Sequence, residues 1–574
     1  MHFKYLCTHN LYRSFFIKKI IINIVSIVLS FYLLLNSICY GGENFEKDLV
    51  SYCNRQILQN SECTLNSKIE LSFFGNKQVE SQLIKNIINS CGGYDDLSIL
   101  LARQKINEFY TCLGYVNSGA ILKKNENNSY SYQIMEGVIS SKNINVIGVN
   151  KRIKTKIIRF LMDGQDKKVL NVNNIRHKLE VLKSYGAFKT INTTIKPLSL
   201  GKAGVDITVN TDAKTNWVLA LDNQQSEATG ATQLSISGDL NNLRNIFDQM
   251  GGGISISEGS RGINFYYNDS PSKKVSWGVS LDKKEVKVIK KPLDKLNIKS
   301  FSEKISFNYN YALYNSLVSF GSTSESEKFD MASKLELSKG ENYLLDRGFS
   351  FSEGEQEGKS KITSLQTNLV WEKKKRSELT NYAISASFGV DIGLNAFNAT
   401  PRSDYSAGSN YKILKANLAY RQTMTDYTNI LLNLNIQKTN DNLLASKKFG
   451  LGGIGSVRGI SKNIGSFNNG LSLTLESSTL LPQLSKTPLG VKSLYDGNFY
   501  GRLFADYAIG IDQSNKSKQA AGSIGIGTSW YLNKDIKLNT SWARPVYFEG
   551  FSAMQKDSVK SNRISFDFIV QGRN

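Results

Sequence analysis

The chain has 574 residues, and its 71 lysines and arginines against 49 aspartates and glutamates give a formal net charge of +22. This length is too great for one ordinary domain. Mean hydropathy is -0.28, and only the N-terminus carries an unbroken apolar run. That argues against a bundle of transmembrane helices, because each helix needs about 20 apolar residues. The basic residues are spread along the chain without a reading motif, so no nucleic-acid partner is expected.

Residues 1–41 are expected to be a signal peptide. Basic residues without an acid, among them Arg13 and Lys19, precede a mostly apolar stretch from Ile20 to Leu35, and small residues follow at 37–42. The alternative is an uncleaved anchor helix. We therefore expect the rest of the chain to be exported from the cytoplasm.

Histidine and cysteine restrict the chemistry. Beyond residue 41 the chain has a single histidine, His177, so no metal, no cofactor and no enzymatic activity are predicted. Four cysteines remain there, namely Cys53, Cys63, Cys91 and Cys112. An even number in an exported region indicates two disulfides, and the spacing does not choose among the three pairings. Zinc is the alternative, although no pair has the usual C-x₂₋₄-C spacing.

Two small α+β domains are predicted after a short polar segment, residues 42–62, which has a weak helical pattern. Residues 63–140 show apolar alternation, then two stretches with helical spacing, then two further alternating stretches. This pattern predicts the order β-α-α-β-β, and it recurs over residues 141–211. Two consecutive copies of one unit are stronger evidence for this fold than either copy alone.

Residues 212–574 consist of short alternating segments separated by Asn, Ser, Gly and Lys clusters. Examples are Tyr382–Ile392, Ile430–Ile436 and Ile524–Trp530, in which one face is apolar and the other is polar or glycine. This alternation is typical of a transmembrane antiparallel β-barrel, and about sixteen strands fit the length at about 10 residues per strand. The competitor is a secreted β-sandwich or β-solenoid adhesin, which the lack of a repeating period disfavours.

One segment, Phe449–Ile460, holds five glycines and a single charge, Arg458. Glycine lets the backbone pack closely in a confined space. We therefore expect an inward-folded loop over residues 447–469 in the barrel lumen, with Arg458 holding the carboxylate of Asp506 at two points. The alternatives are a solvated loop arginine and a G-x-G-x-x-G dinucleotide site. The dinucleotide site lacks the helix that must follow its glycines.

These motifs, in this order, resemble those of the Omp85/TpsB superfamily. Val457-Arg-Gly-Ile460 resembles its Val-Arg-Gly-aromatic loop tip, and Phe504-Ala-Asp-Tyr-Ala508 resembles its Phe-x-Asp-x-Gly strand motif. The two small domains resemble POTRA domains. The resemblance covers nearly all of the chain beyond residue 41 and is greatest for two-partner secretion transporters of the ShlB/FhaC/HecB type.

The resemblance implies a lock in which Val457, Arg458 and Gly459 of the loop dock on Phe504 and Asp506 of the barrel wall. The chain departs from the family pattern at three places. An isoleucine stands where the loop motif has an aromatic residue, an alanine stands where the strand motif ends on glycine, and the C-terminus does not end on an aromatic residue. Either the last strand ends early, or the insertion signal is read internally.

The resemblance also bears on the cysteines. Related first POTRA domains often carry cysteines at the positions of Cys63 and Cys91, which implies that pair and leaves Cys53 for Cys112. Pairing of sequence neighbours, Cys53–Cys63 and Cys91–Cys112, is the alternative. Some relatives carry a helix that plugs the pore through a long linker. A Cys53 bonded to the POTRA domain would keep residues 43–60 from the pore, so no plug is expected.

As a function, the resemblance implies an outer-membrane transporter of a Gram-negative bacterium, with its POTRA domains in the periplasm. It would secrete, and in some relatives activate, a TpsA-type exoprotein such as a haemolysin, adhesin or contact-dependent toxin. Further expected partners are outer-membrane lipid and the barrel assembly machinery. The alternatives are an Omp85-type insertase that folds other barrels, and a surface adhesin or porin.

Overall fold

The structure is a computed structural model. It describes Val50, Cys53 and residues 72–573 except 92–95, 125–129, 185–187, 200, 212–214, 245–247, 273, 321–322, 378–380, 402–406, 483–496, 513–516 and 553–562. The expected signal peptide therefore lies outside the described residues. No helix in the described part of the chain is long and apolar enough to cross a membrane.

The first N-terminal domain has the predicted order β-α-α-β-β. Its elements are β1 (Ser72–Phe74), α3 (Ser81–Ser90), α4 (Asp96–Cys112), β2 (Gly119–Lys124) and β3 (Tyr130–Met135). The sheet order is β1-β3-β2, with β1 parallel to β3. The helices form because their apolar residues recur at helical spacing, and Ile84, Ile87, Ile106 and Phe109 are fully buried in one core with Tyr132 of β3.

A disulfide joins Cys53 to Cys112 at the end of α4. Pairing of sequence neighbours is therefore wrong. Cys91 is buried, and Cys63, the partner that the resemblance gives it, lies outside the described residues. Val50 and Cys53 are helical and lie against the core of this domain. The remainder of residues 43–60 is not described, so the absence of a plug stays a prediction.

The second N-terminal domain differs from the prediction by one strand. It consists of β4 (Val138–Ile147), α5 (Lys151–Leu161), β5 (Lys167–Val169), α6 (Val172–Ser184), β6 (Phe188–Ser199) and β7 (Lys202–Thr211), in the sheet order β5-β4-β7-β6. Strand β5 has three residues and pairs with the start of β4. Three residues are too few to show apolar–polar alternation in the sequence. The strand is recognised only from its pairing with β4 in the structure. Strand β4 begins at Val138, ahead of the boundary expected at residue 141.

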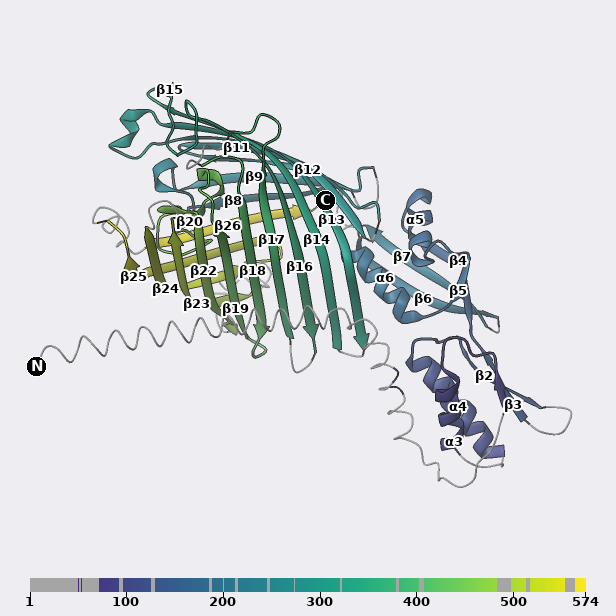
Figure 1. The fold of residues 1–574 in the computed structure, drawn as a ribbon. Helices are drawn as coiled ribbons and strands as arrows, with labels where there is room; N and C mark the ends of the chain where they lie inside the picture. The colour runs from purple at the N-terminus through teal and green to yellow at the C-terminus, as the bar shows by residue number, and fades with distance from the viewer. Residues whose placement is uncertain are drawn as a thin grey trace, which may run out of the picture. The chain divides into compact units, whose positions relative to one another are not determined.

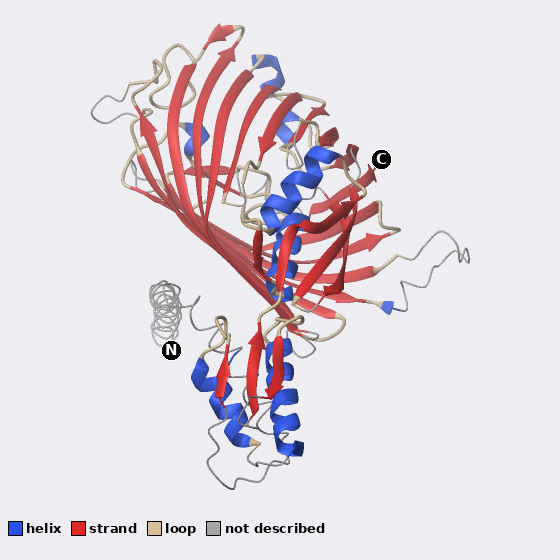
Figure 2. Ribbon diagram, turned by 90° about the vertical axis from the view of Figure 1, so that its right-hand side faces the viewer, coloured by secondary structure: helices blue, strands red, loops and turns tan. Residues whose placement is uncertain are grey.

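The rest of the described chain forms a closed antiparallel barrel of sixteen strands, with the short β15 (Arg347–Gly348) at one rim (Figures 1 and 2). In chain order the strands are β8 (Thr215–Asp222), β9 (Gln233–Asn241), β10 (Gln249–Ser257), β11 (Ser260–Asp269), β12 (Val275–Lys287), β13 (Lys299–Phe320), β14 (Thr323–Leu344), β16 (Lys359–Arg376), β17 (Asn381–Leu394), β18 (Lys412–Thr423), β19 (Thr428–Thr439), β22 (Asn469–Leu480), β23 (Phe499–Ile511), β24 (Lys518–Tyr531), β25 (Ile536–Glu549) and β26 (Arg563–Arg573). The predicted fold class and the strand number of about sixteen are confirmed.

Strand β23 illustrates why these segments form a barrel. Side chains alternate between faces along a strand, and here Leu503 and Tyr507 are exposed while Phe504, Asp506 and Ala508 are buried. An isolated soluble strand would not expose leucine and bury aspartate. The pattern fits an apolar face toward lipid and a lumen face toward other protein groups.

The barrel closes through β26, which pairs with β8 from Asp567–Asp222 to Arg573–Asn216. The non-aromatic C-terminal residues therefore belong to the closing strand, and an early end of the last strand is wrong. Because β8 begins and β26 ends at the same rim, the chain enters the barrel from its N-terminal domains at that rim. We call it the entry rim, and the loop between β19 and β22 starts from the opposite rim.

Candidate functional site

The loop between β19 and β22 lies inside the barrel. It contains the short hairpin β20 (Phe449–Leu451) and β21 (Gly465–Phe467). Its residues contact the inward faces of well-separated strands, since Arg458 reaches Asp506 on β23 and Lys447 reaches Glu336 on β14. A segment that contacts β14 and β23 from the inside must lie in the lumen. This agrees with the predicted inward fold of residues 447–469.

The hairpin is seated on a pair of wall glycines. Phe449 and Phe467 are partners in the hairpin, and Gly470 and Gly510 are partners on β22 and β23. A Cβ at Gly470 would lie 2.1 Å from the Phe449 ring, and one at Gly510 would lie 2.0 Å from the Phe467 ring. Any larger residue would therefore lift a ring from the wall. The two glycines let the hairpin lie flat against the barrel.

An apolar cluster lies between the loop and the wall. The loop contributes Leu451, Val457, Ile460 and Phe467, and the wall side contributes Ala508, Ala521 and Phe551. The departures in the loop motif and the strand motif, Ile460 and Ala508, both fall in this cluster. Ile460 is smaller than the aromatic residue of the motif, and Ala508 is larger than its glycine. The two changes are opposite in volume, so we expect them to compensate in the packing of the loop.

This pairing of departures can be tested by restoring the family residues. Ile460→Phe alone should overfill the cluster and weaken loop docking by about 1–3 kcal/mol. Adding Ala508→Gly should recover much of that loss, because both sites share the cluster. The rate of trypsin cleavage after Lys462, an exposed loop residue, measures docking. If Ala508→Gly makes cleavage faster in both backgrounds, the two residues do not compensate.

Arg458 forms the predicted contact with Asp506. Its Nε and Nη2 donate to the two carboxylate oxygens at 2.8 and 2.9 Å, and its backbone N–H donates at 3.1 Å. The guanidinium carbon lies 3.4 Å from the ring centroid of Phe504. Arg458 and Asp506 are 8% and 4% exposed, so this is a buried two-point ion pair and not a solvated loop arginine.

Val457 and Gly459, on either side of Arg458, hold the backbone that positions its side chain. Val457 is fully buried in the apolar cluster. Gly459 has φ of +83°, and a Cβ there would lie 2.9 Å from the carbonyl oxygen of Ala543 on β25. A side chain at this position would meet both backbone strain and a wall strand. Val457 and Gly459 thus fix the backbone on either side of Arg458.

Two further charged residues belong to this site and were not predicted from the sequence. Arg458 Nη1 donates to Glu476 on β22 at 2.6 Å. The other oxygen of Glu476 lies 3.7 Å from Arg502 Nη1. The sequence signal was weak, since Glu476 is simply the acid that follows the alternating leucines of β22. We call Arg458, Asp506, Glu476 and Arg502 the tip network.

The loop has a second anchor at its base. Lys447, at the end of a 3-10 turn (Ala445–Lys447), donates to Glu336 at 3.1 Å and to Ser364 at 3.0 Å, and lies 3.6 Å from Asp391. These partners come from β14, β16 and β17. Asp391 is 1% exposed and also accepts from Lys415 of β18 at 3.1 Å. The base and the tip of the loop are therefore held by different parts of the wall.

Removing the base anchor should loosen the loop, while the carboxylates of the barrel wall keep their other lysine partners. In Lys447→Met, Glu336 keeps Lys334 at 2.7 Å and Asp391 keeps Lys415. Labelling of a Ser456→Cys tip, whose parent side chain is 4% exposed, by an impermeant maleimide should therefore accelerate about tenfold, equivalent to about 1.4 kcal/mol. Lys415→Met is the matched control, since it removes a wall cation from the same carboxylate. Equal acceleration in both variants would mean that the cluster stabilises the wall only.

The glycine-rich segment does not form a nucleotide site. Strand β20 leads into turns, with Gly453 accepting from Ser456 and donating to Ile460, and no helix follows it between residues 449 and 480. No group of three or more His, Cys, Asp or Glu side chains in the described ranges could hold a metal ion. What the structure shows at this site is an ion pair and an apolar cluster that hold the segment in place.

Comparisons with known proteins agree on one family. A family model described as haemolysin secretion/activation protein ShlB/FhaC/HecB matches residues 201–527. The heme/hemopexin transporter protein HuxB of Haemophilus influenzae (strain 86-028NP) is 22% identical over 494 residues, covering 81% of this chain and 80% of HuxB.

Solved structures agree on the fold. CdiB from Escherichia coli is similar with a TM-score of 0.66 and 16% identity, covering 92% of this chain and 97% of that chain. BamA from Haemophilus ducreyi lacking POTRA domains 1–3 is similar with a TM-score of 0.52 and 12% identity, covering 89% of this chain and 100% of that chain. At these identities the two structures show the fold alone.

Proposed function

The chain belongs to the haemolysin secretion/activation protein family ShlB/FhaC/HecB, and we propose on this basis that it exports a large partner exoprotein through its own barrel. The barrel lies in the outer membrane and the N-terminal domains lie in the periplasm. The entry rim is thus the periplasmic rim. The observation that carries the mechanism is the loop held across the lumen at base and tip.

The N-terminal sheets offer edges on which the exoprotein can add a strand. In the second domain β6 is an edge strand of 12 residues, and most of its residues 191–199 are exposed. An extended segment arriving unfolded can pair with such an edge through main-chain hydrogen bonds. This capture does not require a specific sequence at every position, which suits a long exported chain.

Passage then requires the loop to yield. The tip network and the base anchor hold the loop across the lumen, and an incoming chain must displace one or both. The periplasm offers no ATP, so folding of the exoprotein outside the cell would supply the direction. We propose that Arg458 and Asp506 are the contact that opens and reforms during transport.

The proposed cargo is a haemolysin, an adhesin or a contact-dependent toxin, and activation of this cargo on export is part of the proposal. HuxB is named for heme/hemopexin transport, so a haem-binding exoprotein is a further cargo class to include in a test. Outer-membrane lipid against the apolar outer face and the barrel assembly machinery during insertion complete the proposed partners.

An insertase that folds other barrels is the second candidate, because BamA shares the fold. It fits less well. The family model for secretion proteins matches 201–527, whereas the BamA likeness is one of fold alone.

The direct test is secretion of a candidate exoprotein, for which a large secreted protein encoded by a neighbouring gene would be the first choice. Cells that carry both proteins should release it into the medium, and cells that carry the exoprotein with a transporter lacking residues 72–211 should retain it. Release that does not depend on the transporter would overturn the proposal. Loss of several unrelated outer-membrane barrels after depletion would favour the insertase.

A further inference from the structure

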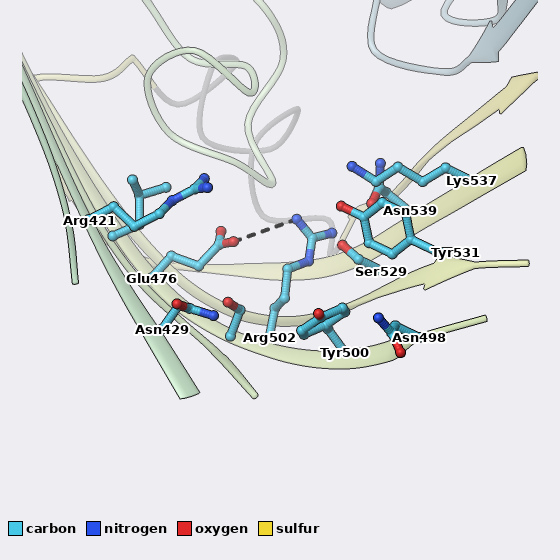
Figure 3. Close-up of a pocket in the computed structure, with 12 residues that line it drawn as sticks. Arg421, Asn429, Glu476, Asn498, Tyr500, Arg502, Ser529, Tyr531, Lys537 and Asn539 are labelled. Atoms are coloured by element: carbon cyan, nitrogen blue, oxygen red, sulfur yellow. Dashed lines mark ion pairs between the residues drawn. The ribbon is translucent and has the colours of Figure 1, made fainter. Parts of the chain in front are cut away.

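A hollow of about 460 Å³ lies in the lumen wall near the periplasmic rim, formed by strands β18, β19 and β22–β25. Figure 3 shows its side chains pointing inward from these strands. Its residues lie close to the ends of their strands at that rim, such as Tyr500 near the start of β23 and Lys537 near the start of β25. A chain entering from the periplasm meets this hollow before it meets the loop tip.

Positive charge in the hollow exceeds negative charge. Arg421, Arg502 and Lys537 line it from three strands, and Glu476 is its one acid. That acid is already engaged, because it accepts from Arg458 at 2.6 Å and lies 3.7 Å from Arg502. In the described part of the chain, neither Arg421 nor Lys537 takes part in an ion pair. Figure 3 shows these two cations on opposite sides of the hollow.

Two buried polar atoms of residues that line the hollow have no hydrogen-bond partner among the described residues. These atoms are Arg502 Nε and Asn539 Oδ1. Such atoms are normally satisfied in folded proteins. One is a donor on a cation and the other is an acceptor, so together they match a ligand that carries a carboxylate and an amide N–H.

We propose that this hollow is a binding site for acidic side chains of the exported chain in extended form. The proposal rests on the proposed function. It states that the first part of the lumen that the exported chain reaches binds its carboxylates. Cations on low-dielectric walls concentrate the field in a cleft, and arginine forks hold carboxylates at two points. Tyr531, whose ring lies 4.9 Å from Lys537 Nζ, and Asn539 provide polar contacts to the main chain.

The site adjoins the tip network. A second hollow, of about 470 Å³, is lined by Ile454 and Gly455 of the loop and shares Glu476 and Arg502 with the first. Arg502 therefore lines the hollow that the entering chain reaches, and it also lies beside Glu476, which binds Arg458. An acidic residue bound here is held directly before the contact that must open.

The test uses the full-length transporter, purified in detergent, and a dye-labelled peptide of about ten glutamates. We expect saturable binding that weakens with salt, and Arg421→Gln/Lys537→Gln should weaken it by about tenfold or more. Lys284→Gln/Lys304→Gln is the matched control, since it removes two strand cations of β12 and β13 that lie outside the hollow. A peptide of about ten glutamines should not bind.

If peptide binding weakens equally in both double variants, overall charge explains the binding and the proposed site is wrong. Unchanged binding in the Arg421/Lys537 variant would also overturn the site. Heat-modifiable migration on gels confirms that each barrel is folded, and Arg421→Gln alone replaces the double variant if that one is not. The outcome is separate from the secretion test. Peptide binding without secretion would refute the proposed function, and secretion without peptide binding would refute only this site.

Discussion

Arg458→Ala is expected to undock the loop and to reduce secretion of the partner exoprotein by well over tenfold, because the proposed transport cycle requires this contact to reform as well as to open. The change leaves Asp506, which is 4% exposed, with the backbone N–H of residue 458 as its remaining contact from the loop. An unpaired buried carboxylate costs about 3–5 kcal/mol. Phe504 also loses the guanidinium that covers its ring. Glu476 keeps Arg502, so the loss falls on loop docking and not on the wall.

Three variants separate this explanation from general damage. Arg458→Lys keeps the charge but loses the two-point geometry, so it should be intermediate. Arg458→Ala/Asp506→Ala removes both buried charges and should dock the loop better than Arg458→Ala alone. Maleimide labelling of a Ser456→Cys tip reports docking, and exoprotein in the medium reports transport. Normal secretion by a variant whose tip labels freely would show that the lock is dispensable.

Removal of the Cys53–Cys112 disulfide should destabilise the first N-terminal domain by about 4 kcal/mol, from the entropy of a loop of this length. The bond closes a sequence separation of 59 residues, and Cys53 is fully buried in the domain core. Stabilities of whole domains are about 5–15 kcal/mol. Cys53→Ala/Cys112→Ala should therefore remove most of the stability of a domain at the low end of this range, so this domain should open more often at 37 °C while the barrel stays intact.

Limited proteolysis of the full-length protein measures this effect. The variant should lose residues 72–135 to protease rapidly, and the heat-modifiable barrel should remain. Adding reductant to the variant then reports on the remaining two cysteines, because a further loss of protection would reveal a second disulfide at Cys91. Equal protease resistance of wild type and variant would contradict a stabilising role for the bond.

The candidate site was partly predictable. Arg458 and Asp506 were found because each sits in a short local motif, and one charge in a glycine-rich segment requires an anchor. Glu476 and Lys447 were not found. Lys447 and Glu336 are 111 residues apart, and a lysine or glutamate on a strand gives no local sign of facing a partner across a lumen. The placement of Ile460 and Ala508 in one cluster was likewise hidden, because the two departures come together only in the folded protein.

The sequence by itself determined the order of elements, the alternating barrel strands, the inward loop and its arginine. These features depend on residues a few positions apart, and the physics of side-chain alternation and helical spacing acts at that range. Only the tertiary structure decided the pairing of Cys53 with Cys112, the strand β5, the closing role of β26 and the second anchor of the loop. Each of these depends on which strand or wall lies opposite, and that is fixed by register and barrel closure across long stretches of chain.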